Sequence, residues 1–158
     1  MIFIAHRGNV FKTNIKRENS PEYIEEAIDL GFDVEIDIRI EDGKIPPGEF
    51  FFGHDYPQYR VDLSWLIERK RNLWIHAKNI DALSWFLRST IDWNVFWHQE
   101  DNYTITSNGY IWAYPGQRAT SNTIIVMPEI TFYSNDMIKS CAGICSDNIN
   151  FYRERFGR

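Results

Sequence analysis

The stretch Asp33-Val34-Glu35-Ile36-Asp37-Ile38-Arg39 decides how the rest of this chain is interpreted. Its apolar and charged residues alternate with a period of two, which predicts a β-strand with its aliphatic side chains on one face. Glu35 and Asp37 then share the opposite face. On an ordinary half-exposed strand such a pair forms a polar outer surface, so the neighbouring sequence has to decide between surface and site.

Histidine motifs lie on both sides of this acidic strand in the sequence. His6-Arg7-Gly8 follows the apolar run at residues 2–5, and His54-Asp55 follows the run Phe50-Phe51-Phe52-Gly53. Carboxylate oxygens hold hard divalent cations, and imidazoles exchange protons near neutral pH. Histidines and carboxylates at the ends of successive strands therefore predict a hydrolytic metal site.

Length and composition predict a single domain over residues 1–158. The chain has 158 residues, of which 44% are hydrophobic and 16% aromatic, and no linker-like stretch divides it. The formal net charge of -5 and the pI near 5.3 argue against binding to nucleic acid or to a membrane surface, which draws on an extended basic patch. Nothing in the composition indicates an oligomeric state.

The N-terminus and the cysteines predict a cytoplasmic protein. The run Met1–Ala5 is shorter than the apolar core of a signal peptide and has no basic leader. Cys141 and Cys145 are therefore expected to be reduced, packed thiols, with a disulfide as the alternative.

Hydrophobic periodicity predicts a regular alternation of strands and helices in the first half of the chain. A helix should begin at Pro21 with Ser20 as its N-cap and end at Gly31. A turn is expected at residues 41–44, followed by an irregular segment at 46–48. The other predicted helices cover residues 61–69, 81–89 and 149–156, and the predicted strands cover residues 2–5, 33–39, 50–53, 73–79, 94–97, 109–114, 123–127 and 143–145.

These elements together predict a compact (β/α)8 TIM-type barrel. Polar residues recur at strand ends, as they do at the catalytic face of such barrels. Because a typical barrel has ~250 residues, several outer helices are expected to be reduced or missing. An open α/β sheet is the alternative fold.

The ordered motifs resemble those of the glycerophosphodiester phosphodiesterase family, a branch of the phosphatidylinositol-phospholipase-C-like barrels. They are His6-Arg7-Gly8, Glu18-Asn19-Ser20, Glu35-x-Asp37 and His54-Asp55, and residues 142–147 resemble the last strand of the family. The resemblance spans nearly the whole chain. It implies a metal-dependent phosphoric diester hydrolase of lipid or glycerol metabolism.

Two departures from the family pattern stand out. The chain passes from Asp55 to the strand at Leu73 without the subdomain that members commonly insert there, which predicts a more open site. Where the family has a metal-binding Glu followed two residues later by Lys, this chain has His76 and Lys78.

The resemblance implies that His6 and His54 are the general acid and base, and imidazole chemistry supports this independently. The alternative is a structural role for each histidine in the core. Arg7 is expected to hold a phosphate oxygen or to pair with a carboxylate, and the two uses are compatible.

Glu18, Glu35 and Asp37 are expected to supply oxygen ligands to Mg2+ or Ca2+. Ion pairing with nearby cationic side chains is the alternative, most of all for Glu18 in its loop. His76 could complete the metal shell and favour Mn2+, or could contact a phosphate or ribose group, or could be structural. Lys78 is expected to stabilise phosphate charge.

Aromatic and polar residues near later strand ends are candidates for the substrate side of the site. Trp112 could offer a stacking platform for a sugar or a base, although such rings more often belong to the core. His98, Glu129 and Asp147 also fall at the expected rim.

The predicted reaction is cleavage of a small soluble phosphodiester, such as a glycerophosphodiester, by histidine acid–base catalysis. The resemblance implies attack by a substrate hydroxyl to give a cyclic phosphate, which water then opens. The sequence specifies neither the alcohol nor the metal. A module that binds a phosphate ligand without turnover is the alternative.

Overall fold

The computed structural model describes residues 1–41 and 49–157, over which the chain forms ten strands in one sheet and five helices. The turn expected at 41–44, apart from Glu41 itself, and the irregular segment at 46–48 lie outside the described residues. The strands are β1 (Ile2–His6), β2 (Asp33–Ile40), β3 (Phe50–Phe52), β4 (Tyr59–Val61), β5 (Leu73–Ala77), β6 (Val95–Phe96), β7 (Tyr103–Ile105), β8 (Ile111–Ala113), β9 (Thr123–Val126) and β10 (Gly143–Ser146). The helices are α1 (Pro21–Asp29), α2 (Leu63–Arg69), α3 (Ile80–Arg88), α4 (Asn135–Ser140) and α5 (Ile149–Phe156).

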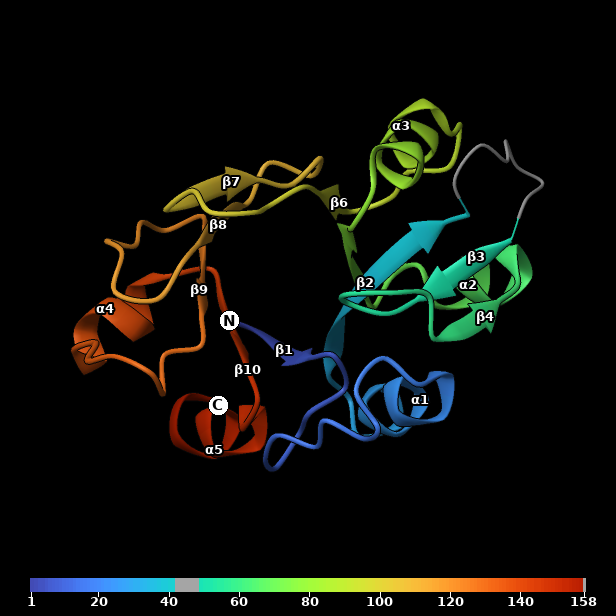
Figure 1. Cartoon of the computed structure of the whole chain (residues 1–158). Helices are drawn as coiled ribbons and strands as arrows, with labels where there is room; N and C mark the ends of the chain where they lie inside the picture. The colour runs from blue at the N-terminus through green and yellow to red at the C-terminus, as the bar shows by residue number, and fades with distance from the viewer. Residues whose placement is uncertain (42–48, 158) are drawn as a thin grey trace.

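Parallel strands form the main body of the sheet in the order β6, β5, β2, β1, β10, β9, β8. The sheet curves strongly, and the helices lie along its outer side (Figure 1). At the two ends of this parallel run, Phe96 on β6 contacts Trp112 on β8 with 4.6 Å between ring centroids.

The prediction of a (β/α)8 barrel is wrong, because the sheet is mixed. Such a barrel needs eight parallel strands, each followed by a helix. Here β3 runs antiparallel to β2 and to β4, and β7 runs antiparallel to β8. Among the described residues, no helix lies between β6 and β9 and no ladder joins β6 to β8. In this short chain, β3–β4 and β7–β8 form antiparallel hairpins in place of βα units.

The arrangement around β2 is what positions the site. One edge of β2 pairs with β5 from Val34 to Ile38. The other edge is shared, because β1 pairs with residues 33–35 and β3 pairs with residues 38–40. Since β1 is parallel and β3 antiparallel to β2, the two strands end facing each other beside Glu35 and Asp37. The motifs that follow them, at His6 and at His54, are therefore brought to the same segment of β2.

The local signals in the sequence explain most of the elements. The Ser20 side chain accepts a hydrogen bond from the Tyr23 backbone N–H and caps α1, which has Pro21 in its first turn. The aliphatic residues of β2 are fully buried: Val34, Ile36 and Ile38. In the described part of the chain, no helix is both long enough and apolar enough to cross a membrane.

Candidate functional site

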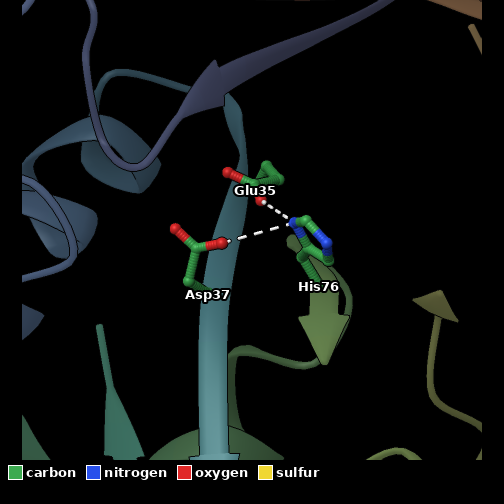
Figure 2. Close-up of side chains that lie close together, drawn as sticks. All are labelled: Glu35, Asp37 and His76. Atoms are coloured by element: carbon green, nitrogen blue, oxygen red, sulfur yellow. Dashed lines mark ion pairs between the residues drawn. The ribbon is translucent and has the colours of Figure 1, made fainter. Parts of the chain in front are cut away.

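Glu35, Asp37 and His76 form a compact group at the centre of the sheet (Figure 2). Asp37 and His76 are register partners on β2 and β5. Each of the three residues offers a ligand atom, and these atoms lie within 4.8 Å of one another. The alternation predicted from the sequence places Glu35 and Asp37 on one face, and both carboxylates are buried there, 2% and 0% exposed.

His76 faces both carboxylates through Nδ1, which lies 3.4 Å from Glu35 Oε1 and 3.3 Å from Asp37 Oδ1. Its Nε2 donates to the His98 carbonyl at 2.9 Å, and its ring stacks on Phe96. Burial disfavours the imidazolium, but the two carboxylates outweigh this effect and raise the pKa of His76 to about 9. At neutral pH, an imidazolium therefore stands beside the carboxylates as their counter-ion.

The donor set fits a divalent cation. Glu35 Oε2 and Asp37 Oδ1 are buried and accept no hydrogen bond, although buried carboxylate oxygens are normally paired. The contacts of His76 to the carboxylates are longer than the ~2.8 Å of a good charge-assisted hydrogen bond. Two hard oxygens and one imidazole nitrogen within this space can hold a metal ion such as Mg2+ or Mn2+ when the ion displaces the Nδ1 proton of His76.

Arg7 and Lys78 supply positive charge next to this group. Arg7 Nε lies 2.8 Å from Asp37 Oδ2, and its Nη1 donates to Glu18 Oε2 at 3.1 Å. Lys78 Nζ lies 3.9 Å from Asp37 Oδ1. Burial lowers the pKa of Lys78. Burial also opposes ionisation of Asp37, but His76, Arg7 and Asn19 hold the pKa of this carboxyl well below its usual range.

Glu18 is predicted as a metal ligand, but the structure places it outside the group of three. Its Oε1 accepts from the Asn9 amide at 3.0 Å and its Oε2 accepts from Arg7. This is the ion pair that the sequence left open as the alternative for Glu18. The carboxylate instead holds Arg7, whose backbone has a φ of 52°, toward Asp37.

His6 forms a dyad with Asp147, in which Nδ1 lies 2.7 Å from Asp147 Oδ1. Its other ring nitrogen, Nε2, lies 3.9 Å from Glu35 Oε2. Burial opposes the charged form of the ring, but Asp147 and Glu35 raise the pKa of His6. Burial opposes ionisation of Asp147, but hydrogen bonds from His6, Thr13 and Asn9 hold its pKa below the ordinary value. Asp147 therefore stays ionised at neutral pH. The dyad therefore orients Nε2 toward the acidic strand.

His54 follows β3 by two residues, and 41% of its side chain is exposed. Its Nδ1 lies 2.6 Å from Asp55 Oδ1, and its carbonyl accepts from Arg39. The hydrogen bond and the charge of His54 lower the pKa of Asp55.

The other predicted substrate residues occupy different positions. Trp112 lies in the core, 4% exposed and packed against Phe96 and Trp74. His98 is also buried and serves the site through its backbone carbonyl, which holds His76. Glu129 accepts from the Asp147 backbone N–H and so fixes the turn that carries the dyad.

Sequence reasoning missed the side chains of Asn9 and Asn19, which are 0% and 1% exposed. Asn19 contacts Asp37, and Asn9 contacts both Glu18 and Asp147. A signal for each was present, since both belong to the quoted motifs or adjoin them. Asparagine amides have no charge, however, and the sequence search followed charged and titratable residues.

Comparisons with protein-family models, with curated proteins and with solved structures gave no match to this chain. The resemblance to the glycerophosphodiester phosphodiesterases therefore stays a prediction from motifs, and the function has to be argued from the site.

Proposed function

We propose that this protein is a metal-dependent phosphodiesterase that cleaves a small phosphodiester at the Glu35–Asp37–His76 group. The observation that carries the proposal is a buried carboxylate pair in which one oxygen of each residue accepts no hydrogen bond, with the His6–Asp147 dyad directed at it. Among the described residues, these two oxygens have cationic or imidazole groups only at 3.3–3.9 Å, whereas buried carboxylate oxygens normally accept close hydrogen bonds.

The residues divide the chemistry among them. A divalent cation held by Glu35, Asp37 and His76 would polarise the phosphodiester. Arg7 and Lys78 offset the negative charge that grows on the phosphoryl oxygens.

Proton transfer falls to His6 and His54. One imidazole takes the proton of the attacking hydroxyl, the new P–O bond forms, and the other imidazole gives a proton to the departing alkoxide. Asp147 keeps the His6 proton on Nδ1 at the start, which leaves Nε2 as the base. His54, which follows β3, is the candidate acid.

Hydrolysis of bis(p-nitrophenyl) phosphate and of glycerophosphodiesters, with and without Mg2+, Ca2+ or Mn2+, tests the proposal. Turnover should require the cation and should be lost in Glu35→Gln, whose cation affinity by calorimetry should also fall. Asp33→Asn is the matched control, because Asp33 lies on the same strand but bonds to Asn72 and Trp74 at its other end. Unchanged cation affinity in Glu35→Gln would refute the metal assignment.

A second function, binding of a phosphate ligand without turnover, is favoured by one observation. His54 is bonded to the exposed Asp55 and is itself partly exposed, so the second proton-transfer group is less firmly held than the first. A chain that binds inorganic phosphate or a diester in calorimetry but hydrolyses none of the diesters with any of the three cations would have this function.

A further inference from the structure

The Asn19 side chain clamps Asp37 from two directions. Its Nδ2 donates to Asp37 Oδ2 at 2.9 Å, and its Oδ1 accepts from the Asp37 backbone N–H at 2.9 Å. Arg7 Nε lies 2.8 Å from the same Oδ2. The clamp therefore occupies one oxygen of Asp37 completely and leaves Oδ1 turned to His76 and Lys78, where a cation would lie.

The backbone conformation of Asn19 positions its side chain for the contact with Asp37. Its φ is 62°, in the left-handed region that asparagine tolerates better than most residues, and its N–H donates to the Arg7 carbonyl at 3.1 Å. The turn before α1 is thereby tied both to the end of β1 and to the middle of β2.

The Asn9 side chain serves the other carboxylates. Its amide group donates to Glu18 Oε1 at 3.0 Å and to Asp147 Oδ1 at 2.9 Å, and its oxygen accepts from Asn14 and Tyr23. These four bonds use both donors and both lone pairs of the amide. The same Asp147 oxygen receives His6 Nδ1, while Thr13 donates to Oδ2 at 2.7 Å.

We infer that two buried asparagines divide the site into halves: Asn19 positions the metal-binding half and Asn9 positions the proton-transfer half. Neither residue contacts the reacting atoms, so both are positioning residues. Outer-shell partners of this kind typically change metal affinity or activity by ~10- to 100-fold when removed. This inference rests on the proposed function, and it predicts which measurement each asparagine governs.

Asn19→Gly tests the metal half. Glycine accepts the left-handed backbone at no steric cost, so the variant removes the clamp without adding strain. Mn2+ affinity measured by calorimetry should fall by ~10- to 100-fold, and activity should return at raised Mn2+. Wild-type Mn2+ affinity in Asn19→Gly would overturn this half of the inference.

Thr13→Val and Asn9→Ala test the proton-transfer half. Asn9 is fully buried and its loss can unfold the loop, whereas Thr13 gives Asp147 one exposed hydrogen bond and its replacement keeps the side-chain shape. Both variants should lower kcat by ~10-fold, and in Thr13→Val, whose hydroxyl bonds only to Asp147 among the described residues, Mn2+ affinity should stay within ~2-fold of the wild type. A fall in Mn2+ affinity equal to that of Asn19→Gly, with kcat retained, would overturn the division.

A readout independent of turnover separates this inference from the proposed function. In NMR spectra, the His6 Nδ1–H resonance should be protected from solvent exchange in the wild type and in Asn19→Gly, and should broaden in Thr13→Val. A wild type that binds Mn2+ but hydrolyses no diester refutes only the proposed function. Equal protection of His6 in all three proteins refutes the role given to the Asp147 bonds.

Discussion

The surroundings of His6, His54 and His76 predict that replacing each histidine by alanine lowers the activity in a different way. His6 is fixed by Asp147, His54 is paired with exposed Asp55, and His76 lies between the two buried carboxylates. Loss of a general acid or base typically costs ~10²- to 10⁴-fold in rate, whereas loss of one ligand among several can be offset by more metal. We therefore expect His6→Ala and His54→Ala to stay inactive at every metal concentration and His76→Ala to recover.

Steady-state rates of the three alanine variants over a range of Mn2+ concentrations check this assignment. Asp33→Asn again serves as the control for a site-distant change. If His54→Ala is nearly as active as the wild type while His76→Ala is inactive at saturating Mn2+, the division of acid, base and ligand is incorrect.

Gly53, which lies between β3 and His54, cannot carry a side chain. Its φ is 145°, and a Cβ there would overlap the Tyr56 carbonyl oxygen. Gly53→Ala should lower the free energy of unfolding by about 2 kcal/mol or more, because strain and steric overlap add. Gly109→Ala is the matched control, since its φ is 82° but nothing lies within 4 Å of the added carbon; urea denaturation should show a loss of only about 1 kcal/mol.

At the scale of single elements, the start of α1 depends on one side chain. The Ser20 hydroxyl accepts the Tyr23 N–H, and Ser20 is 8% exposed. Ser20→Ala should lower the free energy of unfolding, measured by urea denaturation, by about 1 kcal/mol. Ser20→Asp should retain most of the stability. An unchanged midpoint for the alanine variant would show that the cap contributes nothing.

The elements themselves follow from local sequence signals, but their assembly does not. Each of the strands predicted from periodicity is present, and β4 and β7 are additional. Period and capping depend on neighbouring residues, so they can be read locally. Whether Phe50–Phe52 joins β2 parallel or antiparallel depends on non-local pairing, and a run of three phenylalanines looks the same in both cases.

The site shows the same division between local and non-local information. Alternation along β2 correctly placed Glu35 and Asp37 on one face, and β5 brought His76 to them. The pairing of Glu18 with Arg7 and of His6 with Asp147 depends on loop geometry that no spacing rule encodes. Asp147 lies 141 residues from His6, so only the β1–β10 pairing brings the two together.

For the whole molecule, the two buried cysteine thiols, which stay protonated in the folded chain, predict that the free energy of unfolding falls at alkaline pH. Burial raises the pKa of Cys141 from 9.0 to about 11, and that of Cys145 well above 9.0. Above pH 9 the unfolded chain releases these thiol protons while the folded chain keeps them. The free energy of unfolding should therefore fall between pH 9 and about 11, with a slope of at most ~1.4 kcal/mol per pH unit for each thiol.

Urea denaturation at intervals from pH 7 to pH 11 checks this slope. Replacing both cysteines by alanine leaves cavities and lowers stability at every pH, but it should flatten the decline. A decline of the same slope in the double variant would assign the alkaline loss to other groups, such as Tyr152, whose pKa burial raises to about 12.

The predicted openness of the site depends on the whole chain. From Asp55 to Leu73 the described residues form only β4 and α2, and α2 lies on the outer side of the sheet (Figure 1). The His54 side chain is 41% exposed. We expect that a diester with a bulky alcohol is accepted, so kcat/KM should change by less than ~10-fold between glycerophosphodiesters with a small and with a bulky leaving group. A loss of ~100-fold or more for the bulky diester, with kcat unchanged and KM raised, would mean that the site is closed when it binds its substrate.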